Sequence, residues 1–187
     1  AATGNIAILV GGDKNSFKKI LPVLSAMGKK ILHTGALGSA SVLKVITNYL
    51  ASVNLVSIGE ALTVAKKTGM NLKIAYEAIK ISSGNSFVHE TESQVILNGS
   101  YNINFTMDLV LKDMGLFNDL SIKNNIPLEL SPLVLKIFKD GQKKYGPKAW
   151  SSMIVKRLED TCNTNLRAEG FPSELTDYEP EEKGYQI

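Results

Sequence analysis

The segment Gly35–Asn48 opens the longest helical pattern in the chain, which runs to about Thr68. Two glycines, Gly35 and Gly38, come before it, and its middle contains a long stretch without charged residues. At 1.5 Å per residue, such a helix is about 45 Å long. A helix that is apolar on nearly all sides is normally buried. The chain is therefore expected to build a helical body around this segment.

A narrow polar line interrupts the apolar surface of this helix. Lys44, Asn48 and Ser52 follow one another at intervals of four residues, so they share one face. The surrounding positions are expected to be buried: Val42, Leu43, Ile46, Leu50, Val53 and Val56. Two interpretations of Lys44 are open. Its ammonium could reach water near the helix start, or burial could lower its pKa and suit it to proton transfer.

The residues around Lys44 carry a family resemblance. From Gly35 to Asn48 the chain reads G-x-x-G-x-A-x-x-x-K-x-x-x-N. This resembles the catalytic signature of the β-hydroxyacid dehydrogenases, which include 3-hydroxyisobutyrate dehydrogenase and, more distantly, 6-phosphogluconate dehydrogenase. The resemblance implies that Lys44 is the general acid and base and that Asn48 holds the lysine or the substrate oxygen. Ala40 stands where the family commonly has a third glycine, and Thr47 where many members have another Asn.

The first part of the chain predicts a strand, a helix and a second strand. An apolar run at residues 6–10 indicates a buried parallel strand. A helical pattern follows, ends at Gly28, and should be kinked or split by Pro22. A second strand over residues 30–33 completes one βαβ unit. Gly11-Gly12-Asp13 and Met27-Gly28 also match the end of the family's Rossmann-like domain. A G-x-G-x-x-G turn is absent, so the chain is interpreted as a piece of a longer protein.

Beyond the long helix, the pattern is helical throughout. Helices are expected after an Asn71 cap, over residues 87–98, from a Thr106 cap to about residue 124, from a Ser131 cap to residue 145, and over residues 149–160. The remaining segment has little apolar pattern and is expected to lie loosely on the surface. The predicted fold is mainly α: a helical domain like the C-terminal domain of 6-phosphogluconate dehydrogenase, preceded by a βαβ remnant of a Rossmann-like domain. The predicted divisions are 1–34, 35–160 and 161–187.

A second lysine lies in the pattern that begins at Thr106. Asp108 precedes Lys112 by four residues, so a surface ion pair is one interpretation. The segment Phe105-x-x-x-Leu109-x-x-Lys112-Asp113 also resembles the second motif of the same family. That resemblance implies that Lys112 reaches the nicotinamide end of a bound cofactor, NAD or NADP, and that Phe105 belongs to the same cofactor site.

Other candidate residues favour ordinary structural roles. His33 and His89 are isolated, and a strand end or a helix surface suits them better than general base catalysis. Tyr145 and Trp150 are expected to pack locally. The polar loop Ser82–Ser86 could touch a substrate, although a loop between helices needs no such role.

Composition excludes several classes of function. The net charge of +3 is too small, and the basic residues are too scattered, for a nucleic-acid partner. One cysteine and two histidines leave no metal site to predict. No apolar run is long enough to predict a membrane span, and a cytoplasmic or organelle-matrix location fits the composition.

The family resemblance implies an NAD(P)-dependent oxidoreductase that interconverts a small 3-hydroxy acid and its semialdehyde. These 187 residues alone are expected to be inactive, because the phosphate-binding turn and the family's carboxylate-binding Ser-Gly-Gly segment are absent from the sequence. The apolar circumference of the long helix predicts a homo-oligomer. The alternative function is a dehydrogenase-derived helical domain that serves only in dimerisation or partner binding.

Overall fold

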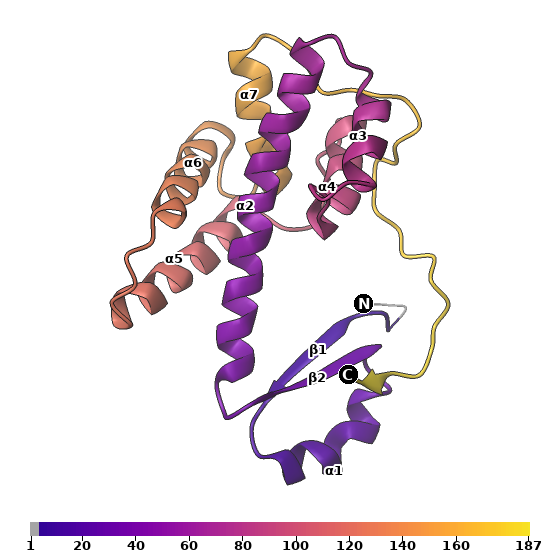
Figure 1. Cartoon of the computed structure of the whole chain (residues 1–187), viewed down its shortest axis with the longest axis vertical. Coiled ribbons are helices and arrows are strands. Elements are labelled where there is room, and N and C mark those ends of the chain that lie inside the picture. The colour runs from indigo at the N-terminus through magenta and orange to yellow at the C-terminus, as the bar shows by residue number, and fades with distance from the viewer. Residues whose placement is uncertain (1–3) are drawn as a thin grey trace. The chain divides into compact units, whose positions relative to one another are not determined.

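The computed structural model describes residues 4–187 and is mainly helical, with one small parallel sheet (Figure 1). The predicted fold class, a helical domain with a long helix preceded by a βαβ unit, is confirmed. The elements are β1 (Ala7–Gly11), α1 (Lys14–Leu24), β2 (Lys30–Gly35), α2 (Ser39–Lys67), α3 (Leu72–Lys80), α4 (Phe87–Asn98), α5 (Met107–Lys123), α6 (Leu130–Tyr145), η1 (Ser151–Ile154), α7 (Lys156–Thr161) and β3 (Tyr185–Gln186).

The chain divides into two compact units. The first contains the chain up to Thr47 together with Thr176–Ile187, and the second contains Asn48–Leu175. The last segment of the chain therefore joins the unit formed by the first.

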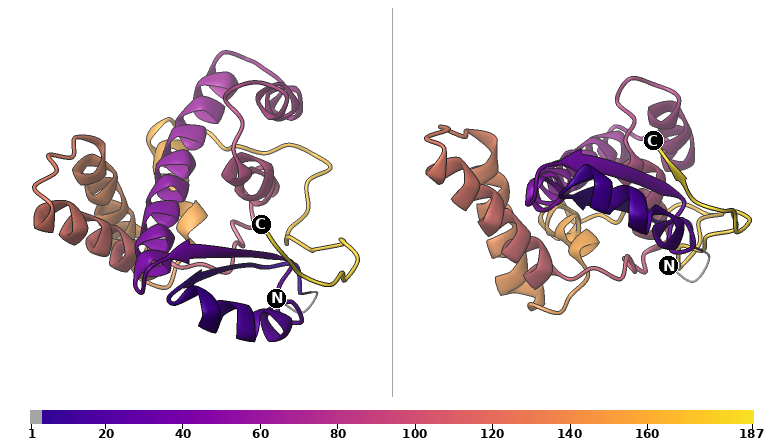
Figure 2. Two further views of the ribbon diagram at one scale, coloured as in Figure 1. Left: turned by 60° about the horizontal axis from the view of Figure 1, so that its bottom comes forward. Right: turned by 90° about the horizontal axis from the view of Figure 1, so that it is seen from below.

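The first unit is a three-stranded parallel sheet in the order β1-β2-β3. Ile8 is opposite Ile31, which is fully buried, and α1 covers one face of the two long strands (Figure 2). Asp13 caps α1 by accepting a hydrogen bond of 2.8 Å from the backbone N–H of Ser16. Of the two outcomes predicted at Pro22, a kink or a split, the split is wrong, because α1 continues through Pro22 to Leu24. Pro22 lies in the last turn, where few residues remain to lose helical bonds.

The turn between β2 and α2 requires glycine at two positions. Gly35 and Gly38 have φ values of 110° and 92°, a region that other residues rarely adopt. A side chain at Gly11 would place its Cβ 2.8 Å from the carbonyl oxygen of Ala36, so β1 needs glycine where it meets this turn. The hydroxyls of Thr34 and Ser39 lie 2.6 Å apart across the turn. These contacts determine where α2 starts and, through it, where Lys44 lies.

The second unit is a helical body packed on the second half of α2. Leu55, Ile58 and Leu62 of that helix are buried in one apolar cluster. The other large members of the cluster come from α3, α4, α5, α6, η1 and the segment after α7: Leu72, Tyr76, Ile96, Leu97, Met107, Met114, Val134, Phe138, Ile154 and Leu166. By length and composition alone, α2 also qualifies as one helix able to cross a membrane. In this unit, however, its second half forms the centre of the apolar cluster.

The predicted burial of the first half of α2 is wrong for this chain. Val42, Leu43 and Leu50 are 40%, 36% and 51% exposed. The fully buried positions of α2 begin only at Ser52. The apolar composition therefore predicted the helix correctly. It did not show how much of the helix surface the rest of the same chain can bury.

Two helix boundaries also differ from the prediction. α6 begins at Leu130, so Ser131 lies inside the helix and its hydroxyl donates to the side-chain oxygen of Asn118 instead of capping. Pro132 still fits, because the first turn of a helix needs none of its own N–H groups. The helix predicted over residues 149–160 is a short 3-10 turn, η1, followed by α7.

The segment after α7, predicted to be loose or draped on the surface, is more ordered than that at its end. Tyr185 and Gln186 form β3, which pairs in parallel with Lys30 and Ile31 of β2. A segment with few apolar residues can dock in this way because backbone pairing does not depend on side-chain type.

Candidate active site

The polar line on α2 is present, and its members differ in environment. Lys44 is exposed, Asn48 is half-buried and Ser52 is buried. The hydroxyl of Ser52 donates a hydrogen bond of 2.9 Å to the carbonyl oxygen of Asn48. Because α2 is continuous, Lys44 and Asn48 lie one turn apart on the same face.

Asn48 is joined to α5 by a side-chain hydrogen bond. Its Nδ2 donates to Oδ2 of Asp113, whose side chain is only 15% exposed. An ionised carboxylate can only accept hydrogen bonds, so the amide must present its nitrogen to Asp113 and its oxygen elsewhere. Asp113 therefore determines which way the Asn48 amide faces.

A second contact between α2 and α5 involves the next residue of α2 and a residue one turn further along α5. The rings of Tyr49 and Phe117 are stacked, with centroids 4.0 Å apart and planes 6° from parallel. This stack and the Asn48–Asp113 hydrogen bond hold the two helices together at two adjacent positions. The packing of α2 against α5 thus places residues of the two sequence motifs in direct contact.

Lys112 lies on α5 next to Asp113. Its ammonium is 3.3 Å from Oδ1 of Asp113, and its side chain is 62% exposed. Leu109 and Leu116, one turn before and after it, are 37% and 45% exposed. The apolar stripe around Lys112 thus faces outward instead of into the core.

The alternative interpretation of Lys112 as the partner of Asp108 is wrong. Asp108 instead binds the ammonium of Lys148 at 2.6 Å, and this bond lowers the pKa of the Asp108 carboxyl. Phe105, the other residue assigned to the cofactor, is half-buried against the helical core. Its carbonyl oxygen accepts a hydrogen bond of 2.8 Å from the N–H of Ser151.

The two histidines have structural partners. Nε2 of His33, near the end of β2, lies 2.8 Å from the carbonyl oxygen of Gly12. His89 was expected on a helix surface but is fully buried, between the hydroxyl of Ser93 and the carbonyl oxygen of Tyr76. The polar and apolar residues of α4 do not separate cleanly along the sequence, so its buried face could not be identified.

The polar loop Ser82–Ser86 borders a cavity of about 410 Å³, with Asn54 and Ser57 of α2 on its other side. The loop side chains are engaged in local structure. Ser86 caps α4 through the N–H of His89, and the amide of Asn85 donates to Glu90. The cavity gives no specific support for a substrate-binding role of this loop.

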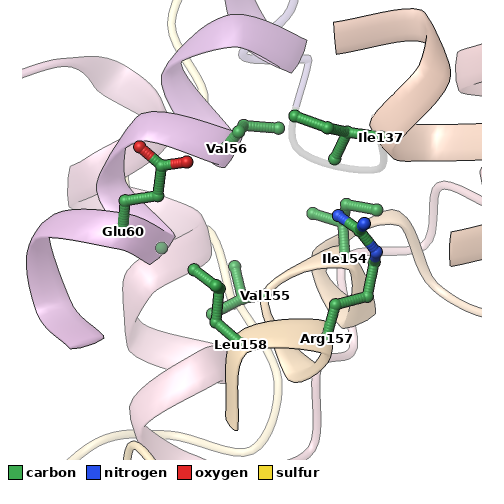
Figure 3. Close-up of a pocket in the computed structure, with 8 residues that line it drawn as sticks. Val56, Glu60, Ile137, Ile154, Val155, Arg157 and Leu158 are labelled. Carbon is green, nitrogen blue, oxygen red and sulfur yellow. The ribbon is translucent and has the colours of Figure 1, made fainter. Parts of the chain in front are cut away.

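A smaller cavity lies where α2, α6 and α7 meet (Figure 3). Apolar side chains line it, with the charged groups of Glu60 and Arg157 on different sides. Its volume is only about 40 Å³. It is a packing gap between helices.

Two family models match the chain in succession. Residues 1–35 match the NAD-binding domain of 6-phosphogluconate dehydrogenase. Residues 38–158 match the model described as NAD-binding of NADP-dependent 3-hydroxyisobutyrate dehydrogenase. The two matches meet at the turn that leads from β2 into α2.

Individual relatives agree with the family models. The chain is 36% identical over 167 residues to 2-(hydroxymethyl)glutarate dehydrogenase of Eubacterium barkeri, covering 89% of this chain and 56% of the relative. It is 28% identical to the mitochondrial 3-hydroxyisobutyrate dehydrogenase of Rattus norvegicus, covering 82% of this chain and 48% of that one. The crystal structure of 3-hydroxyisobutyrate dehydrogenase from Salmonella typhimurium is similar with a TM-score of 0.76 and 27% identity, over 84% of this chain and 55% of that one. The chain thus spans about half the length of the relatives it matches.

Proposed function

The chain belongs to the β-hydroxyacid dehydrogenase family, and we propose that the complete protein is an NAD(P)-dependent oxidoreductase that interconverts a small 3-hydroxy acid and its semialdehyde. In that protein, residues 1–34 would complete the cofactor-binding domain and residues 35–160 would form the helical catalytic domain. The hydrogen bond between Asn48 and Asp113 carries this proposal, because it connects the two motifs that the resemblance identifies.

Lys44 is proposed as the general acid and base. During reduction its ammonium donates a proton to the carbonyl oxygen of the substrate, and during oxidation the neutral amine takes a proton from the hydroxyl group. The cofactor, when bound, supplies or accepts the hydride.

Asn48 is proposed to position the reacting groups. Asp113 holds its Nδ2, so its Oδ1 is directed elsewhere and is suited to accept a hydrogen bond from the Lys44 ammonium or the substrate hydroxyl. Asp113 is thus a positioning residue that acts through Asn48. It is the last letter of the second motif, and sequence reasoning assigned it no role.

Lys112 and Phe105 are proposed to line the nicotinamide pocket. The outward-facing strip formed by Leu109, Lys112 and Leu116 fits that group, because it offers apolar surface beside a single cation. Phe105 is packed on the helical core and would contribute a fixed edge of the pocket.

The test is a substitution series in the complete protein, assayed with NAD, NADP and a panel of 3-hydroxy acids. Lys44→Ala should lower kcat by about 10²–10⁴-fold and change cofactor affinity little. Lys112→Ala should mainly weaken cofactor affinity, measured by fluorescence titration. Lys66→Ala, at the far end of the same helix, is the control and should behave as wild type. Normal turnover by Lys44→Ala would disprove the proton-transfer role.

The alternative, a non-catalytic dimerisation module, is favoured by one observation. The exposed residues Leu43, Leu50 and Val64 lie at intervals of seven or fourteen on α2, so they form a stripe along one side of the helix. A complete protein that self-associates but binds neither NAD nor NADP would support this alternative against the enzyme.

A further inference from the structure

The edge of β2 that faces away from β1 is occupied by the segment Thr176–Ile187. Three of its backbone N–H groups donate hydrogen bonds to backbone carbonyl oxygens within residues 25–31. Gly184 donates to Ser25 at 2.8 Å, and Tyr185 donates to Lys29 at 2.9 Å. Ile187 donates to Ile31 at 3.0 Å. The segment therefore docks by adding a strand to a sheet edge.

Ion pairs and hydrogen bonds hold the segment in place before β3 begins. The ammonium of Lys29, whose side chain is 19% exposed, lies 3.0 Å from Glu179 and 3.3 Å from Glu182. Both carboxylates raise the pKa of Lys29. Asn5 donates to the side chain of Asp177 and to the carbonyl oxygen of Glu179. One half-buried cation thus receives two acidic residues from the same segment.

Gly184 gives this docking its steric selectivity. It is buried, and a Cβ added there would lie 1.9 Å from the carbonyl oxygen of Gly28. That contact is with backbone, so no side-chain movement could relieve it. The edge therefore accepts glycine at this position and excludes larger residues.

The side chains of the segment contribute little buried apolar surface. Tyr178, Tyr185 and Ile187 are 88%, 49% and 58% exposed. The docking therefore depends on backbone hydrogen bonds and on ion pairs that salt can screen. These are the properties of a contact that can detach while the rest of the fold stays intact.

We propose that the β2 edge is a docking site for an acidic extended segment, and that Thr176–Ile187 of the same chain occupies it as a detachable strap. The site recognises two acidic residues at Lys29, a glycine against Gly28, and a strand of backbone along β2. This inference is independent of the proposed catalytic function, since none of its residues belongs to the candidate active site.

Amide hydrogen exchange of Tyr185 and Ile187 in the full chain tests the proposal. Glu179→Lys should speed exchange of both amides by about tenfold or more, because it places a second cation beside Lys29. Glu181→Lys is the matched control, since it makes the same change in charge two residues away. It should leave the exchange rates within about twofold of wild type. About 1 M salt should reproduce the effect of Glu179→Lys in the wild-type protein.

Gly184→Ala separates the backbone fit from the charges. It should abolish protection of Tyr185 and Ile187 while the amides of the helical body keep theirs, which shows that the fold is intact. Full protection in Gly184→Ala would overturn the proposal, as would equal effects of Glu179→Lys and Glu181→Lys. Protection that disappears on dilution would also overturn it, because the occupant would then come from a second copy.

Discussion

Asp113 offers the most direct test of the candidate site at a single side chain. Asp113→Asn keeps the size of the residue but removes the charge and allows either end of the amide to face Asn48. Hydrogen bonds to charged groups contribute about 1.5–3 kcal/mol, so kcat should fall by about 10- to 100-fold. The contact proposed between the Asn48 oxygen and Lys44 predicts that the pH profile of kcat also shifts.

Asp119→Asn is the control for this variant. Asp119 is exposed on the same helix, and the substitution makes the same change in charge. Steady-state kinetics of the two variants should differ clearly. If both retain wild-type kcat and the same pH profile, Asp113 has no positioning role.

Glu92 predicts an unusual dependence of stability on pH. Its Oε2 has no hydrogen-bond partner among residues 4–187, and burial raises the pKa of its carboxyl from 4.5 to about 7. Between these two values the folded state binds more protons than the unfolded state. The free energy of unfolding should therefore fall as the pH rises from about 4.5 to 7 and stay lower above that.

Glu92→Gln should remove this dependence. At pH 8 the variant should be more stable than wild type by about 1–3 kcal/mol, and near pH 4.5 the two should be alike. Urea unfolding at a series of pH values measures both. Glu77→Gln, on the exposed surface of α3, should leave the pH dependence as it is in wild type.

Single residues were predictable where a motif identified them and unpredictable where burial decided their role. Lys44, Asn48 and Lys112 were selected because they match motifs of the family, and their roles stay predictions that the kinetic variants test. Asp113 belongs to the second motif, but nothing in the sequence assigned it a role of its own. Its importance depends on α5 packing against α2, which no local pattern reveals.

Among the elements, α7 depends on one buried carboxylate. Glu159 is 3% exposed and accepts hydrogen bonds from the N–H of Leu166 at 2.6 Å and from Arg167 at 2.9 Å. The hydroxyl of Tyr101 also donates to it, and burial is the main reason that the pKa of this phenol is raised. The network attaches the chain after α7 to the loop before α5.

Glu159→Ala should destabilise the fold by about 2–5 kcal/mol, because it leaves the buried N–H of Leu166 and the hydroxyl of Tyr101 without their acceptor. Glu169→Ala removes an exposed carboxylate from the same stretch and should change stability by less than about 0.5 kcal/mol. Denaturant unfolding followed by circular dichroism compares the two. Equal stabilities would show that the network contributes nothing.

The helices themselves were largely predictable, because caps and apolar spacing are local. Asn71 and Ser86 begin α3 and α4 as side-chain caps. Thr106 begins α5 at the predicted place, although its hydroxyl binds Asp108 instead of capping the helix. β3 could not be predicted, since two exposed residues become a strand only when a distant sheet edge is available to them.

For the molecule as a whole, the main uncovered surface to explain is an exposed stripe along one side of α2. Leu43, Leu50, Ser57 and Val64 recur every seven residues and are all exposed. An interval of seven drifts only about 20° around a straight helix, so these positions form one continuous stripe. A stripe of this kind on an apolar helix is suited to pack against the same stripe of a second copy.

We therefore expect the complete protein to self-associate through α2, with Leu50 near the centre of the contact. Leu50→Lys would place an unpaired charge in that contact, and each 1.4 kcal/mol of lost association energy weakens binding about tenfold. The dissociation constant measured by light scattering should rise by about 100-fold or more. Ile122→Lys, at a residue 74% exposed on α5, should leave the assembly unchanged. A strict monomer at micromolar concentration, or an assembly that tolerates Leu50→Lys, would mean that α2 is not the contact.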